Sequence, residues 1–149
     1  MINLLIDNRT DKENLEDIFF EDILLALEAC YKVEGLEGDY EISFSFVGPE
    51  EIKDLNKNYR GKDTVTDVLS FPLSLPEEDP DYYLGDIVVC LDRASEQALE
   101  FNHSLKREII YLTIHSFFHL LGYDHMNDSE KKIMREKEKS AVIEVGVFK

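Results

Sequence analysis

Three of the four histidines in this 149-residue chain lie close together, at His115, His119 and His125. The segment reads as a helix, so His115 and His119, four positions apart, share one face and can hold one ion. Gly122 permits a sharp turn, because glycine adopts positive φ without cost, and this turn can bring His125 to the same face. Three imidazoles leave one tetrahedral position for water, as in catalytic zinc sites. The spacing therefore predicts about one zinc ion per chain.

Two alternatives to a catalytic zinc site start from the same segment. A structural zinc would need a fourth ligand, and Asp124 is available, although its position beside His125 makes joint ligation awkward. The metzincin proteases share the three histidines and the glycine, in the pattern H-E-x-x-H-x-x-G-x-x-H. Their general-base glutamate would stand at position 116, where this chain has Ser116, which cannot take a proton from water near neutral pH. Protease chemistry is therefore not expected. The fourth histidine of the chain, His103, is expected at the surface.

A second set of chemically capable residues flanks Gly61. Arg60 and Lys62 lie in a polar loop expected between a helix and a strand. An exposed arginine can hold a phosphate through two parallel hydrogen bonds. The alternative is that Arg60 pairs with one of the many carboxylates of this acidic chain. For an arginine considered by itself, that role is the more common one. Together with the histidines, Arg60 becomes the candidate catalytic residue.

The elements that position these residues follow from hydrophobic periodicity. Strands are expected at residues 1–9, 40–47, 67–73 and 84–91, the second with one face in water and the fourth central and buried. Helices are expected at 10–33, 49–59, 92–102, 104–121 and 129–145, and an acidic excursion at 75–80. This order predicts an α+β fold, a small mixed four-stranded sheet packed with about five helices. The metal site would lie at the C-terminal end of a helix, in a zincin-like arrangement.

Length and composition fit one compact domain over residues 1–149. The net charge of −16 argues against broad, non-specific nucleic-acid binding but allows a local basic site. No apolar run reaches the length of a membrane span, and the N-terminus lacks the features of a signal peptide. Cys30 and Cys90 lack the spacing of a metal or redox pair and are expected to be buried thiols in the cytoplasm.

Four motifs taken together carry a family resemblance. They are Tyr59-Arg60-Gly61-Lys62-Asp63, Thr66-Asp67-Val68-Leu69-Ser70-Phe71-Pro72, Leu84-Gly85-Asp86-Ile87, and the segment from His115 to His125 ending in Gly-Tyr-Asp-His. In order and spacing this set resembles the YbeY family of bacterial endoribonucleases. Two positions depart from the family pattern: Ser116 stands where glycine is common and Val65 where proline is common.

The resemblance implies a cytoplasmic, metal-dependent, single-strand-specific endoribonuclease in ribosomal RNA maturation and ribosome quality control. The metal ligands of the family map onto His115, His119 and His125, and its functional arginine onto Arg60. The implied partners are single-stranded ribosomal RNA and the ribosome or a ribosomal protein. The expected chemistry is phosphodiester hydrolysis, in which the ion activates water and Arg60 holds the phosphate.

Two other functions remain open from the residues alone. One is a zinc hydrolase of the metalloprotease type, and the other is a non-catalytic ribosome-assembly factor with a structural metal. Among the acidic residues, Asp124 could orient a ligand imidazole, whereas Asp67 and Asp86 are read as structural hydrogen-bonding groups.

Overall fold

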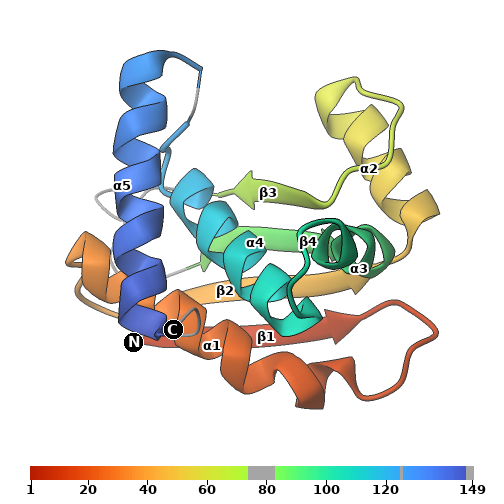
Figure 1. The fold of residues 1–149 in the computed structure, drawn as a ribbon, viewed down its shortest axis with the longest axis horizontal. Helices are drawn as coiled ribbons and strands as arrows, with labels where there is room; N and C mark the ends of the chain where they lie inside the picture. The colour runs from red at the N-terminus through yellow and green to blue at the C-terminus, as the bar shows by residue number, and fades with distance from the viewer. Residues whose placement is uncertain (74–82, 125, 147–149) are drawn as a thin grey trace.

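A mixed sheet organises the computed structural model, which describes residues 1–73, 83–124 and 126–146. The strands are β1 (Ile2–Asn8), β2 (Tyr40–Val47), β3 (Val68–Pro72) and β4 (Tyr83–Cys90), in the spatial order β1-β2-β4-β3 (Figure 1). The β1–β2 and β2–β4 pairs are parallel, and β3 runs antiparallel to β4. The helices in the described part are α1 (Leu15–Glu34), α2 (Pro49–Arg60), α3 (Leu91–Glu100), α4 (Leu105–Leu120) and α5 (Asp128–Val145). The predicted α+β fold with a mixed four-stranded sheet and five helices is confirmed.

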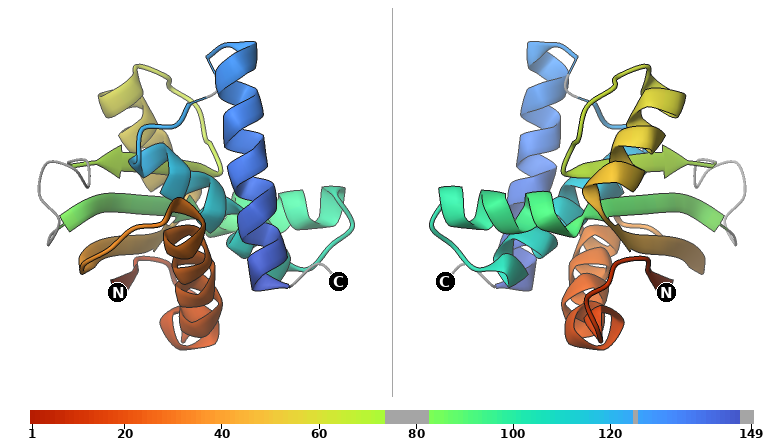
Figure 2. Two further views of the ribbon diagram at one scale, coloured as in Figure 1. Left: turned by 90° about the vertical axis from the view of Figure 1, so that its left-hand side faces the viewer. Right: turned by 90° about the vertical axis from the view of Figure 1, so that its right-hand side faces the viewer.

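The main core lies between the sheet and the helices α1 and α4. Alternate residues of β4 face opposite sides of the sheet. Ile87 and Val89 belong to the main core, whereas Val88 and Cys90 pack in a second, smaller core with Ile52 of α2. Helix α5 packs against α1 and α4, and Figure 2 shows these three helices together on one side of the sheet. Helix α4, which carries His115 and His119, is thus held between the sheet and α5.

Gly85 of β4 sets how closely the end of α4 approaches the sheet. Its φ is 155°, and a Cβ built there would lie 2.5 Å from the carbonyl oxygen of Phe71 and 2.8 Å from the side chain of Leu120. Real Cβ atoms do not approach other atoms so closely, so the position requires glycine. Because Leu120 follows His119 directly, this close contact places the C-terminal end of α4 against β4.

Two expected elements differ from the structure. Helix α1 begins at Leu15 rather than at residue 10. Asn8 accounts for the delay, because its side chain accepts hydrogen bonds from the backbone nitrogen and hydroxyl of Thr10 and donates one to the carbonyl of Lys12. Such side-chain hydrogen bonds compete with helix formation.

Strand β2 is the second correction. It was expected to keep one face in water, and Glu41 near its start is indeed exposed. From Phe44 to Val47 every residue is buried, including Ser45. The reason is tertiary: β2 lies between β1 and β4, and α2 covers the second face of the sheet near Val47.

The predictions for the cysteines and for strand β4 are confirmed. Cys30 and Cys90 are buried free cysteines, as predicted. Strand β4 is central and almost completely buried, also as predicted. The acidic excursion at 75–80 lies outside the described residues. In the part of the chain that the structure describes, no helix has the length and apolar character needed to cross a bilayer.

Candidate metal centre and phosphate-binding cavity

Local sequence signals fix both ends of α4. The hydroxyl of Ser104 accepts a hydrogen bond from the backbone nitrogen of Arg107 at 3.1 Å, which caps the first turn. At the other end, Gly122 has a φ of 95° and donates its backbone N–H to the carbonyl of His119 at 3.0 Å. The helix therefore begins and stops where the sequence predicts. His119 lies in the last turn before the chain reverses.

The imidazoles of His115 and His119 converge. Their Nε2 atoms lie 3.1 Å apart and their ring centroids 4.6 Å apart. Two imidazole nitrogens bound to one tetrahedral zinc at roughly 2.0–2.1 Å would be about 3.3 Å apart. The separation and the donor type therefore fit two ligands of a single ion. In the absence of an ion, the same separation suits a hydrogen bond between the two rings.

Glu138 of α5 fixes the orientation of His115. An oxygen of its carboxylate lies 3.2 Å from Nδ1 of His115. A carboxylate only accepts hydrogen bonds, so Nδ1 carries the proton and donates it, which leaves the Nε2 lone pair available for an ion. Carboxylate–histidine–metal chains of this kind are common in metalloproteins. Glu138 is 23 positions from His115, so no local spacing in the sequence links the two residues.

Tyr111 covers the other side of His115. The two rings stack with centroids 6.1 Å apart and an angle of 16° between their planes. Burial is the main cause that raises the pKa of Tyr111 to about 12, and the nearby carboxylate of Glu138 adds to the increase. The phenol is therefore protonated near neutral pH, and it restricts the ring of His115 by packing rather than by charge.

Arg60 reaches the same cavity from α2. Gly61, with a φ of 70°, ends α2 and donates its N–H to the carbonyl of Lys57. The buried side chain of Asn56 donates a hydrogen bond to the carbonyl of Thr64 at 3.0 Å and so ties down the loop that follows. Within the described residues Arg60 is exposed and forms no ion pair, in contrast to the alternative of a loop arginine neutralised by a carboxylate.

One cavity of about 580 Å³ brings these residues together. Arg60 lines it from the end of α2 and Lys62 from the connection to β3, and His115 and His119 line it from α4. Asp124 also lines this cavity. The result is a hollow lined by paired imidazoles from α4 and by two cationic side chains from the end of α2 and the loop that follows it.

The third expected ligand, His125, lies outside the described residues. In the described ranges, no cluster of three His, Cys, Asp or Glu side chains is arranged to hold a metal ion. Ser116, which replaces the protease glutamate, is completely buried, so its hydroxyl does not reach the cavity.

His103 was expected at the surface, but it is half-buried and paired. Its Nε2 lies 2.8 Å from the carboxylate of Glu108, which is itself buried. The two residues are five positions apart across the start of α4, so the pairing depends on how the α3–α4 connection folds back over the first turn of the helix.

A basic surface next to the histidines was missed from the sequence. Lys131 and Arg135 of α5 are exposed and line a shallow hollow together with His115 and Glu138. The signal was present, because these two cations are four positions apart and therefore share one helix face. What the sequence did not reveal is that this face of α5 adjoins α4 at His115.

Paired imidazoles and an exposed arginine in one hollow are the kind of side chains that a metal-dependent hydrolase site uses. Comparison with known proteins narrows the class. Residues 5–146 match the family model described as Endoribonuclease YbeY. The chain therefore belongs to the YbeY family, and the predicted resemblance is confirmed.

Individual relatives agree over nearly the whole chain. Endoribonuclease YbeY of Finegoldia magna is 51% identical over 97% of this chain and 94% of its own length. Its counterpart in Alkaliphilus oremlandii is 47% identical over 99% of this chain and 100% of its own length. A Thermotoga maritima protein solved in solution superposes with a TM-score of 0.64 at 35% identity, covering 96% of this chain and 89% of that one.

Proposed function

We propose that this protein is a metal-dependent endoribonuclease that cuts single-stranded RNA during ribosomal RNA maturation and ribosome quality control. Membership of the endoribonuclease YbeY family supports the nuclease activity. The observation that carries the proposal is the meeting of His115, His119 and Arg60 in one cavity. We further propose that residues 1–149 form a single catalytic domain and that the protein acts in the cytoplasm.

The proposed cofactor is one zinc ion per chain, held by His115, His119 and His125. The 3.1 Å separation of the first two Nε2 atoms and the proton on Nδ1 of His115 support this ligand set. When bound, such an ion supplies Lewis acidity that activates water and polarises a phosphoryl oxygen. The chain holds the imidazole of His115 in place through the hydrogen bond to Glu138 and the stacking of Tyr111.

Arg60 binds the phosphate and offsets the charge that develops in the transition state. Lys62 lines the same cavity and adds positive charge at its edge. Lys131 and Arg135 lie on the other side of His115 and extend the cationic surface towards α5. These four cations locally reverse the field of a chain whose net charge is −16, which resolves the conflict between overall acidity and an RNA substrate. The remaining acidic surface suits contact with a basic ribosomal protein.

The two alternatives fit less well. A metalloprotease of the metzincin type needs a general base after its first histidine, and here that position is the buried Ser116. A non-catalytic assembly factor would have no need for an exposed arginine that lines the same cavity as paired imidazoles. The family, described as endoribonucleases, also favours RNA cleavage over both alternatives.

The test compares one RNA sequence as a single strand and as a perfect duplex, with and without chelator. A flexible strand can bend into the cavity, whereas a duplex presents its phosphates on a rigid cylinder. Cleavage should therefore be faster on the single strand, should stop with chelator, and should be absent in His119→Ala. Equal rates on both forms, or cleavage that survives chelation, would contradict the proposal.

A further inference from the structure

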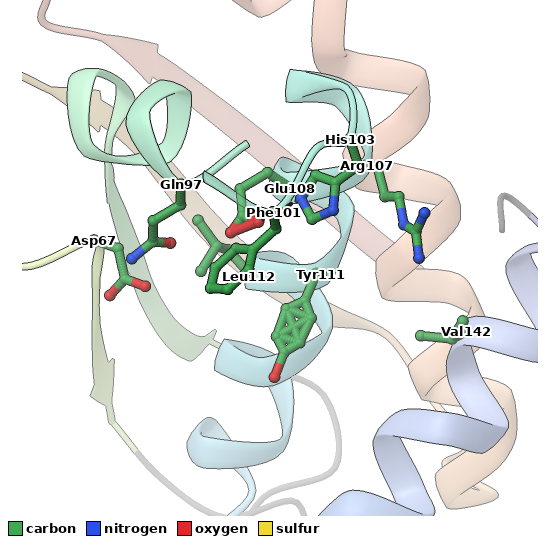
Figure 3. Close-up of a pocket in the computed structure, with 9 residues that line it drawn as sticks. All are labelled: Asp67, Gln97, Phe101, His103, Arg107, Glu108, Tyr111, Leu112 and Val142. Atoms are coloured by element: carbon green, nitrogen blue, oxygen red, sulfur yellow. Dashed lines mark hydrogen bonds and ion pairs between the residues drawn. The ribbon is translucent and has the colours of Figure 1, made fainter. Parts of the chain in front are cut away.

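A second cavity, of about 570 Å³, lies next to the metal cavity and has no part in the function proposed so far (Figure 3). It is bounded by the C-terminal end of α3, the first half of α4 and one side chain of α5. Its volume is in the range of small-molecule sites. Two residues connect it to the metal cavity. Asp67 lines both, and Tyr111 lines the second cavity while its ring stacks on His115.

Exposed aromatic side chains are the first notable feature of this cavity. Phe101 is 65% exposed and Tyr111 is 42% exposed, although both are large rings that normally avoid water. Figure 3 shows both rings in the middle of the pocket, Phe101 at the end of α3 and Tyr111 on α4. Proteins that bind single-stranded nucleic acids use such rings as platforms on which bases stack.

Charge decides which part of a nucleotide would enter. Asp67 and Glu108 place carboxylates in the lining, but Glu108 is only 4% exposed and its carboxylate contacts His103. Arg107 also lines the cavity, and Figure 3 shows its side chain on the side away from Asp67 and Gln97. Carboxylates repel a phosphate but accept hydrogen bonds from the amino groups of bases. Gln97, on the same side of the pocket as Asp67 in Figure 3, adds an amide that both donates and accepts.

We propose that this cavity is a base-binding subsite for the RNA substrate. A nucleobase next to the scissile phosphate stacks on Phe101 and Tyr111 and directs its edge towards Asp67 and Gln97. Bases with an exocyclic amino group (adenine, cytosine and guanine) are favoured over uracil, which lacks that donor. This inference rests on the proposed endoribonuclease function, since it assigns the subsite to the strand whose phosphate lies at Arg60.

The first experiment uses fluorescence, because the chain contains no tryptophan. Phe101→Trp places a single indole in the cavity. Leu99→Trp places one two positions earlier, in the last turn of α3, at a residue that is 84% exposed and outside the lining. Metal-loaded protein is mixed with a fluorescein-labelled single-stranded RNA by stopped flow, before cleavage proceeds. Base stacking should quench the indole at 101 and leave the indole at 99 unchanged. Equal responses at both positions, with binding shown by anisotropy, would overturn the subsite.

The second experiment measures cleavage of oligoribonucleotides that carry one abasic nucleotide at successive positions around the cut. With the parental protein, one abasic position next to the cut should lower kcat/KM roughly ten-fold, the effect of losing one stacked base. In Phe101→Ala the same abasic position should have no further effect, whereas Leu99→Ala should behave like the parent. Replacing an amino-bearing base at that position by uracil should cost less than removing the base altogether.

The outcomes separate the two proposals. A parental enzyme that cuts every abasic substrate at one rate overturns the subsite and leaves the nuclease function intact. An additive effect of Phe101→Ala and the abasic nucleotide also overturns it. If the protein neither binds nor cuts single-stranded RNA, both the proposed function and the subsite are contradicted.

Discussion

Nδ1 of His115 on α4 donates a hydrogen bond to the carboxylate of Glu138 on α5, across 3.2 Å. This contact joins two helices and determines which nitrogen of His115 is available to a metal ion. Glu138 is thus a positioning residue, which acts on the ion through the imidazole rather than by touching it.

Glu138→Gln should weaken zinc binding by about 10- to 100-fold, because the neutral amide holds the imidazole less firmly and no longer increases its basicity. The measurement is zinc affinity by competition with a chromophoric chelator. Glu136→Gln, two positions away on the exposed side of the same helix, is the matched control and should bind zinc like the parent. Identical affinities in both variants would show that the contact with His115 has no influence on the site.

His119→Ala should reduce the bound metal from about one ion per chain to a small fraction, since it removes one of three ligands. RNA cleavage should fall to background in the same variant. The side chain is only partly buried, so far-UV circular dichroism should match that of the parent. Full metal occupancy in His119→Ala, determined by elemental analysis, would place the ion elsewhere.

Arg60→Ala should lower kcat for RNA cleavage by roughly 10²- to 10³-fold, the usual cost of losing one group that stabilises transition-state charge. The melting temperature and metal content should not change, because the side chain is exposed and unpaired among the described residues. Lys53→Ala, at an exposed position of the same helix, controls for loss of one charge. Equal kcat values for Arg60→Ala and Lys53→Ala would exclude a catalytic role.

Lys131 and Arg135 should contribute to RNA affinity through phosphate contacts. Replacing both by alanine should weaken binding to a single strand and reduce the slope of log K against log[salt] by about 1.4, or about 0.7 for each lost phosphate contact. The double variant Lys12→Ala/Lys53→Ala changes the net charge equally at exposed positions on other elements. If both double variants shift the slope alike, the effect comes from net charge and not from this face of α5.

Gly85→Ala should destabilise the fold by about 1–3 kcal/mol, since a Cβ overlaps the carbonyl of Phe71 and the side chain of Leu120. Gly48→Ala is the control, because a Cβ there meets nothing within 4 Å. Urea unfolding of the two variants measures the difference in the free energy of unfolding. A Gly85→Ala protein as stable as Gly48→Ala would mean that α4 and β4 separate without cost.

Much of the fold and half of the candidate site could be predicted from the sequence, because the relevant signals are local. Apolar periodicity located all the strands and helices to within a few residues, apart from the start of α1, where the side chain of Asn8 holds an alternative turn. Ser104 and Gly122 fixed the ends of α4, and the four-residue spacing of His115 and His119 already implied that their rings meet.

Contacts between elements were decided by the tertiary structure alone. Periodicity shows that α5 has an apolar face, but not that packing against α4 places Glu138 beside His115 and Arg135 near it. It likewise could not show that α2 covers the second face of the sheet near Val47, or that His103 pairs with the buried Glu108. The physical reason is that a repeat along one element records which face is apolar, whereas the partner of that face depends on how separate helices and strands pack.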